Sequence, residues 1–405
     1  MGADPLFVDG VDGGVLAIVA FKVVVAFVFL LISVMLMIWF ERKVVGDLQN
    51  RIGPNRAGPF GILQTLADGV KLFFKEDLLP SAADRRVFRL APYLAIVPAF
   101  VTFAIVPVGG VFHGERTGTV SLFGKETYFQ VADPPIGILL FLAMSSIAVY
   151  GVMLAGWSSG SKYPLLGSVR ASAQMVSYEA ALGLSVITAV FITGTLSTHD
   201  MVEAQTNLQW NLWAAGVVPF LIFLLAGTAE LNRPPFDLVE AEQELVGGYH
   251  TEYSSLRFAL FFLAEFMNVI TMSAIIVTLF LGGPDGPILF GPDFVWPLIW
   301  FFGKLMVFLF IFVWLRATLP RFRYDQLMDL GWKRMIPLSL VWLLLIAGLR
   351  IFPGDDRNLS DVAVVFVAGL AGLAVAFGLL AAAVRRGAEE AAHQLEAGQL
   401  ESGGR

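Results

Sequence analysis

Long apolar runs alternate with short polar segments along the whole chain. Nine runs are long enough to cross about 30 Å of hydrocarbon as helices, and they occupy residues 13–40, 90–109, 135–157, 174–196, 213–231, 256–282, 295–318, 335–352 and 362–384. Only helices and closed barrels satisfy their backbone groups inside a bilayer. The pattern therefore predicts an all-α, polytopic membrane helix bundle of about nine transmembrane helices.

Two of the connecting segments show other periodicities. Within residues 60–75, Leu66, Val70 and Phe73 fall on one helical face, and Asp68 and Lys71 fall on another. A helix of this kind lies in the plane of a membrane surface, so we predict an in-plane amphipathic helix on the cytoplasmic side. Residues 110–134 contain glycines and alternating residues, which predict a short hairpin without a chemical role.

Basic residues predict the orientation of these segments. Most of the 27 Lys and Arg fall in one set of loops, and the opposite set holds only Arg116, Lys125, Arg350 and Arg357. Basic loops remain in the cytoplasm, so the N-terminus is predicted outside and the C-terminus inside. We expect one membrane domain over residues 1–352, an additional helix within 353–385 and a cytoplasmic tail at 386–405.

Composition narrows the class of protein further. Hydrophobic residues make up 57% of the chain, charged residues 15%, and the mean hydropathy is +0.74, which excludes an ordinary soluble domain. The chain has no Cys and so cannot form disulfides or ligate iron–sulfur clusters through thiolates. No phosphate-binding loop or dinucleotide fingerprint occurs. The chain is therefore not expected to move electrons by itself or to bind nucleic acid.

Carboxylates are concentrated between the fifth and sixth apolar runs. One arginine, Arg233, stands among Glu230, Asp237, Glu240, Glu242, Glu244 and Glu252. A solvated acidic loop is one explanation, but the interleaved Pro235, Phe236 and Leu238 favour a segment folded back against the protein. In that case Arg233 either organises ion pairs or contacts a ligand, and the sequence leaves both roles open.

Three carboxylates lie in or beside apolar runs on successive predicted helices: Glu179, Glu230 and Glu265. An ionised carboxylate at that depth costs a few kcal/mol, so it normally has a partner or a function. We interpret the three as a relay that exchanges protons. Lys304, also within an apolar run, is expected to pair with a carboxylate, and Lys22 is expected to extend towards the membrane surface.

Several long motifs resemble a known family. They are Glu41-Arg42-Lys43-Val44-Val45-Gly46, Gly53-Pro54-Asn55-Arg56-Ala57-Gly58-Pro59, Gln64-Thr65-Leu66-Ala67-Asp68, Phe74-Lys75-Glu76-Asp77, Ser177-Tyr178-Glu179 and Ala229-Glu230-Leu231-Asn232-Arg233-Pro234-Pro235-Phe236-Asp237. Together they resemble the family of the H subunit, the quinone-chamber membrane subunit, of proton-pumping NADH–quinone oxidoreductase, respiratory complex I. The resemblance covers roughly residues 12–352.

The resemblance implies roles for particular residues. The quinone-chamber residues would be Glu41, Arg42, Arg51, Asp68, Glu76, Arg233 and Asp237. The proton path would comprise Glu179, Glu230, Glu240, Glu242, Glu244 and Glu265. Neither set is catalytic in itself or binds metal, and the chain would couple quinone reduction to proton translocation.

The resemblance also implies cofactors, partners and a location. Ubiquinone or menaquinone would be the substrate, while FMN and iron–sulfur clusters would belong to partner subunits. The partners would be the peripheral quinone-module subunits, small membrane-arm subunits and membrane lipid, in the inner membrane of a bacterial cell.

The sequence departs from the family pattern at two places. Phe266 follows Glu265 where the family often has Tyr, and the run at 362–384 adds a ninth span where eight are common. We expect the added helix to contact a neighbouring subunit or lipid. Two alternatives stay open: the anchor subunit of a related membrane-bound hydrogenase-type complex, and a free-standing cation/proton transporter.

Overall fold

The computed structural model describes residues 4–8, 10–112, 118–238, 246–288, 292–351, 367 and 371. The longer helices of the described part are α1 (Gly13–Leu48), α3 (Arg85–Phe103), α4 (Gly137–Ser158), α5 (Lys162–Thr193), α8 (Val217–Glu230), α10 (Ser255–Phe280), α11 (Val295–Thr318) and α13 (Ile336–Ile351). The shorter elements are η1 (Pro5–Phe7), η2 (Pro59–Gly61), α2 (Gln64–Phe74), α6 (Thr198–Glu203), α7 (Asn211–Ala214), η3 (Gly248–His250), α12 (Tyr324–Asp329) and the π-helical turn η4 (Leu330–Met335).

This helical architecture confirms the predicted fold class. In the described residues, seven helices are long and apolar enough to cross a membrane, the last of them running continuously from Tyr324 to Gly348. An eighth apolar helix, α8, has 14 residues and matches the predicted run at 213–231. The predicted ninth span at 362–384 and the tail at 386–405 lie outside the described residues, apart from 367 and 371.

Two differences from the predicted helix boundaries change the placement of candidate site residues. Helix α1 continues to Leu48, so Glu41 and Arg42 lie on its last turns rather than in a loop. Helix α5 begins at Lys162, ahead of the predicted start at 174, so Glu179 lies near its middle. Hydropathy marks the part of a helix that contacts lipid, whereas backbone hydrogen bonding continues into the polar segments at either end.

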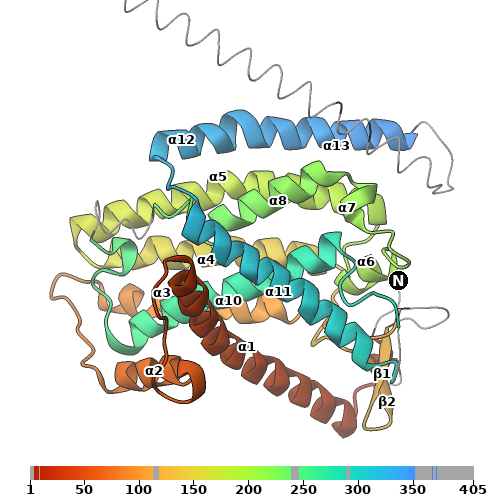
Figure 1. Cartoon of the computed structure of the whole chain (residues 1–405), viewed down its shortest axis with the longest axis horizontal. Helices are drawn as coiled ribbons and strands as arrows, with labels where there is room; N and C mark the ends of the chain where they lie inside the picture. Colours follow the sequence, from red (N-terminus) through yellow and green to blue (C-terminus); the bar gives the residue numbers. More distant parts are fainter. Residues whose placement is uncertain are drawn as a thin grey trace, which may run out of the picture.

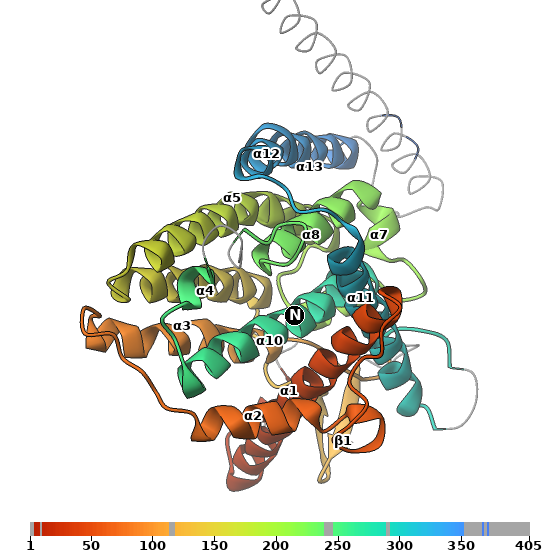
Figure 2. The ribbon, with the colours of Figure 1, turned by 60° about the vertical axis from the view of Figure 1, so that its left-hand side comes forward.

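The helices pack in layers (Figures 1 and 2). Helices α3, α4, α5 and α8 pack side by side in chain order, and α10 packs against α3. Helices α1 and α11 both contact α10 and each other, and they cross the other helices obliquely in Figure 1. Helix α13 lies beyond α5 and α8. We call the end that carries α2 the α2 end, and the opposite end the hairpin end.

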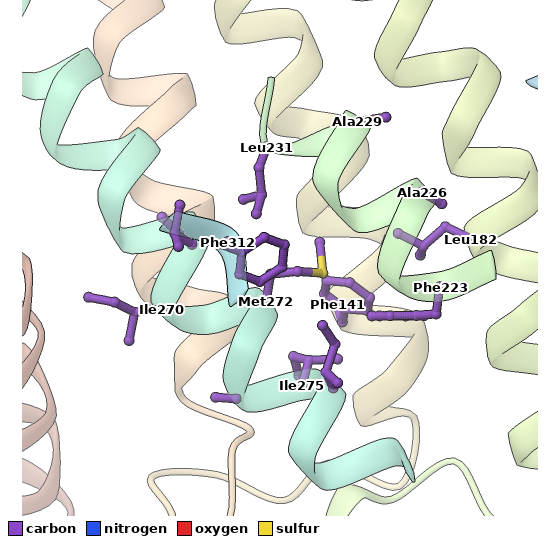
Figure 3. Packing of buried hydrophobic residues seen from close by; sticks show 14 of the residues in the cluster. Phe141, Leu182, Phe223, Ala226, Ala229, Leu231, Ile270, Met272, Ile275 and Phe312 are labelled. Atoms are coloured by element: carbon purple, nitrogen blue, oxygen red, sulfur yellow. The ribbon is translucent and has the colours of Figure 1, made fainter. Parts of the chain in front are cut away.

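The hydrophobic core joins five of these helices (Figure 3). Phe141 of α4, Leu182 of α5, Phe223 of α8, Met272 of α10 and Phe312 of α11 point towards one another. All five are almost completely buried. Helix α10 is central because nearly all of its residues from Phe266 to Phe280 are buried, and it fixes the positions of the polar residues on its first turns.

The hairpin and the amphipathic helix form close to where the sequence predicts them. Strands β1 (Thr119–Leu122) and β2 (Lys125–Tyr128) pair antiparallel. The two residues between them, Phe123 and Gly124, both have positive φ, as a tight hairpin turn requires. Helix α2 begins at Gln64 rather than 60. Its apolar side chains Leu66, Val70, Phe73 and Phe74 are exposed, as a helix that lies on a membrane surface requires.

The main contacts of two buried lysines differ from the expected ones. Lys304 donates to three backbone carbonyl oxygens, those of Leu281, Gly283 and Asp285, at 2.7, 3.0 and 2.8 Å. It therefore caps the end of α10 rather than pairing chiefly with a carboxylate. Lys22 is 8% exposed; its side chain donates to Thr127 of the hairpin at 2.6 Å and lies 3.5 Å from the Asp4 carboxylate. Both lysines hold the hairpin end together.

Candidate functional site

Four charged side chains meet at the α2 end of the bundle. Arg233 lies 2.8 Å from a Glu265 carboxylate oxygen through Nε and 3.0 Å from Glu41 through a terminal nitrogen. The other oxygen of Glu41 contacts the Arg316 guanidinium. The four groups thus form a chain of alternating sign, which we call the charge chain: Arg316, Glu41, Arg233 and Glu265.

The charge chain draws one residue from each of four elements. Glu41 lies near the end of α1, Arg316 near the end of α11, Glu265 about three turns into α10, and Arg233 in the turn that follows α8. Arg233 is 4% exposed and Glu41 is 8% exposed. Charges that are this buried persist only when they are paired, and here two cations balance two carboxylates.

The turn after α8 holds Arg233 in place. Asn232 adopts a positive φ of 52°, a conformation that Asn tolerates better than most residues. Gln174 of α5 donates to the Ala229 carbonyl at 2.8 Å and to the Asn232 side chain at 3.1 Å. Phe236, fully buried, packs against Tyr178 with ring centroids 5.3 Å apart. The backbone is therefore fixed on both sides of the arginine.

An aromatic ring completes the environment of Arg233. Its guanidinium carbon lies 4.4 Å from the centroid of the Phe266 ring, within the range of a cation–π contact. A phenyl ring can supply this contact without a hydroxyl. Phe266 therefore stabilises the cation of the charge chain without a hydroxyl.

A cavity of about 360 Å³ adjoins one end of the charge chain. We call it the arginine cavity. It is lined by Glu41, Arg42, Val45, Arg51, Ile52, Gly53, Pro54 and Arg316. Three arginines against one glutamate give it an excess of positive charge and many hydrogen-bond donors. Such a lining suits a polar group with acceptor oxygens, because each guanidinium offers several fixed N–H groups.

The loop between α1 and α2 bounds this cavity through close backbone packing. A Cβ on Gly53 would lie 3.0 Å from the Arg42 carbonyl oxygen, and one on Gly61, where φ is +76°, would lie 2.6 Å from the Pro54 backbone. Glycine is therefore required at the second position and favoured at the first. The Gly/Pro-rich motif of the sequence is thus a packing requirement.

Helix α2 is tied to the rest of the α2 end by polar contacts. Arg42 pairs with Asp68 at 2.9 Å, and Arg257 pairs with Asp77 at 3.0 Å. The backbone oxygen of Glu76 accepts a hydrogen bond from Ser254 at 3.2 Å. Asp68 and Glu76, both predicted to line the chamber, therefore lie in the segment that closes the α2 end, with Asp68 engaged in an ion pair.

Two further carboxylates are held by neighbouring serines of α4. Ser145 donates to Glu230 of α8, and Ser146 donates to Glu179 of α5. A small cavity of about 40 Å³ touches Glu230, Ser145, Asn268 and Thr271. A cavity of that size with several polar groups in its lining is large enough for ordered water. The structure thus brings Glu179 and Glu230, which the sequence places on successive helices, to adjacent residues of one helix.

The other residues predicted for the chamber and the proton path lie apart from the charge chain or outside the described residues. Arg51 is exposed and lines the arginine cavity. The Asp237 backbone oxygen accepts a 3.4 Å hydrogen bond from Arg321, and its side chain is partly buried. Glu240, Glu242 and Glu244 lie outside the described residues. Within the described part of the chain, no group of three or more His, Asp or Glu residues is arranged to hold a metal ion.

Three residues of the site are absent from the sequence-based prediction. In the sequence, Arg316 is one of many basic residues beside apolar runs, and nothing singles out Ser145 and Ser146. A cation on the last turn of an apolar helix is common, and serine pairs in apolar helices are too. No local signal distinguishes these residues, because their roles depend on which helices become neighbours.

Comparisons with known proteins identify the family of the chain. Residues 21–347 match the family model described as NADH dehydrogenase. The chain is 53% identical over 348 residues to the H subunit of NADH-quinone oxidoreductase from Frankia alni, an alignment that covers 84% of this chain and 75% of the relative. It is 51% identical to the protein of the same name from Frankia casuarinae, with the same coverage. The matched region contains every residue of the charge chain.

Proposed function

Because this chain belongs to the NADH dehydrogenase family, as an H subunit of NADH-quinone oxidoreductase, we propose that its α2 end forms much of a quinone chamber coupled to proton transfer. The single observation that carries this proposal is the charge chain, which connects the arginine cavity to Glu265. Neither a hydrogenase-type anchor nor a free-standing transporter is retained, since both relatives carry the name of the quinone-reducing enzyme.

In this proposal the quinone headgroup binds in the arginine cavity or passes through it. Quinone carbonyl oxygens accept hydrogen bonds, and Arg42, Arg51 and Arg316 are donors around the cavity. Glu41 holds Arg316 and Arg233 in position. In this proposal Asp68, Glu76 and Asp237 shape the walls and their loops, while Arg233 transmits charge to the interior.

A path for protons leads inward along α10. Glu265 and Asn268 are three residues apart on this helix and so lie on the same face. Asn268 and Thr271 line the small cavity at Glu230, and the Ser145 and Ser146 pair links Glu230 to Glu179. Glu240, Glu242 and Glu244 are proposed to extend this path towards the chamber. The charged groups would then pass protons on when the charge of the chamber changes.

The surroundings of the protein follow from the same proposal. The exposed apolar side chains of α1, α2 and α13 would contact lipid and small membrane-arm subunits, and the α2 end would contact peripheral subunits that hold FMN and iron–sulfur clusters. The basic loops support a bacterial inner-membrane orientation with the N-terminus outside and the α2 end at the cytoplasm.

A matched pair of arginine substitutions tests the chamber. Arg51 lines the arginine cavity, whereas the exposed Arg56 of the same loop does not. In membranes that contain the assembled complex, Arg51→Ala is expected to raise the KM for quinone about tenfold, the effect of one charge-assisted hydrogen bond. Arg56→Ala should leave the KM unchanged. Equal KM values in the two variants would contradict the proposed chamber.

A further inference from the structure

Glu265 also borders a second cavity, which the other members of the charge chain do not line. This cavity, of about 200 Å³, is lined by Val246, Gly247, Tyr249, His250, Phe258, Phe261, Phe262 and Glu265. We call it the aromatic cavity. The arginine cavity touches the charge chain at Glu41 and Arg316, so the two cavities meet opposite ends of the same chain of charges.

The aromatic cavity reaches the surface at the α2 end. Val246 at its rim is 61% exposed and lies between α8 and α10 in the chain, just before η3. The wall is formed by rings: His250 packs edge-on against Tyr249 and Phe258, at centroid distances of 5.1 and 5.4 Å. The polar side chains among these lining residues are Glu265, His250 and Tyr249.

We infer that Glu265 takes up protons from the cytoplasmic side through the aromatic cavity, with His250 positioning the water that delivers them. The inference rests on the function proposed above and adds a route and a positioning residue to it. A cavity of this size holds several waters, and a water there needs polar partners; Glu265 and His250 supply them. In the transfer step a hydronium ion in the cavity gives its proton to the Glu265 carboxylate and leaves as water, and no electron moves.

Fixed charges on one side of Glu265 make a separate route for protons on its other side useful. Arg233 pairs with it, Arg316 and Glu41 continue the charge chain, and Asp237 also acts on it through its charge. The side of Glu265 that faces the charge chain is therefore occupied by fixed ions. The aromatic cavity offers the other side, where the titratable groups among the described lining residues, besides Glu265 itself, are His250 and Tyr249.

His250 positions water and does not carry the proton. Burial lowers the pKa of His250 to about 4, so the imidazole is neutral at the pH at which the enzyme works. A neutral imidazole has one donor and one acceptor nitrogen and can orient a water on either side. An amide can imitate this function, whereas an aliphatic side chain cannot.

The test compares His250→Leu, His250→Asn and the cavity-filling Phe258→Trp in membranes, with native gels to measure the assembled complex. We expect the NADH-driven, quinone-linked turnover of His250→Leu and Phe258→Trp to fall about three- to tenfold at pH 8 and much less at pH 6, because proton supply becomes limiting when hydronium is scarce. His250→Asn should restore most of the turnover. Phe123→Trp, at the exposed hairpin tip, is the matched control and should behave as the parent enzyme.

Three outcomes would overturn the inference. They are unchanged turnover in both His250→Leu and Phe258→Trp, a loss that is equal at all pH values, and a His250→Asn variant as slow as His250→Leu. Glu265→Gln separates this failure from failure of the proposed function. If Glu265→Gln is inactive while the cavity variants are normal, only the aromatic route is wrong; if Glu265→Gln pumps normally, the proposed function fails as well.

Discussion

At the α2 end, Glu41 is shared by two arginines and Arg233 by two carboxylates, whereas at the hairpin end Lys304 donates to three backbone carbonyl oxygens. Both ends bury charge among apolar helices. The lysine uses all three of its protons on fixed acceptors, so its surroundings have one stable arrangement. The charge chain instead depends on how many of its carboxylates are ionised, and it borders cavities. The shared ion pairs of the charge chain are therefore suited to respond to a change of charge. The hydrogen bonds of Lys304, which use all of its protons, are suited to hold structure.

Removal of the shared cation should have the largest effect. Arg233→Leu leaves Glu41 and Glu265 without their common partner, and loss of one member of a buried ion pair costs about 3–5 kcal/mol. We expect poor assembly and the loss of quinone-linked activity in whatever complex does assemble. The amount of complex on native gels and the turnover per complex measure the two effects. Normal turnover per complex would show that the charge chain is only structural.

Replacement of Lys304, which donates to three carbonyl oxygens, should affect stability alone. Lys304→Met leaves three carbonyl oxygens of the hairpin end without their donor, and partial rehydration should limit the cost to about 3 kcal/mol. Thermal inactivation of the purified complex should begin at a lower temperature. Turnover per assembled complex at low temperature should equal that of the parent, and a clear loss there would remove the distinction between the two ends.

The smallest effect concerns pH. Burial lowers the pKa of His250 to about 4, so below the unfolded-state value near 6.5 the unfolded chain binds a proton that the folded chain does not. The contribution of this residue is fully present above pH 6.5 and is lost as pH falls towards 4. The free energy of unfolding should therefore fall by about 1 kcal/mol less in His250→Asn than in the parent when the pH is lowered from neutral to 5.5. Identical pH dependence in the two proteins would show that His250 is not buried in the assembled complex.

The sequence predicts more of the fold than of the pairing within the site. Hydropathy locates the spans, and the amphipathic and alternating patterns locate α2 and the hairpin, because these signals are local. Hydropathy does not reveal the extension of α1 through Glu41 and Arg42, since these polar residues leave the hydrocarbon before the helix ends. Nor does the sequence reveal the Arg316 contact to Glu41, because it depends on the packing of α1 against α11, far apart in the chain.

The charged residues near a cation in the sequence predict its partners only in part. Arg233 stands among many carboxylates, so ion pairing is one of its two predicted roles, and the structure shows which two carboxylates it selects. Lys304 has no such neighbours. Its carbonyl partners cannot be identified from residue types, because every residue has a carbonyl and only the fold brings those beyond the end of α10 to one point.

Proton pumping driven by NADH and linked to quinone, measured in membrane vesicles of Glu265→Gln beside Lys304→Met, tests the central claim most directly. Both variants remove a charge from an apolar helix, one at each end of the bundle. We predict that Glu265→Gln assembles but no longer pumps, and that Lys304→Met retains the parent ratio of protons pumped to NADH oxidised. Normal pumping by Glu265→Gln would contradict the assignment of proton coupling to the charge chain.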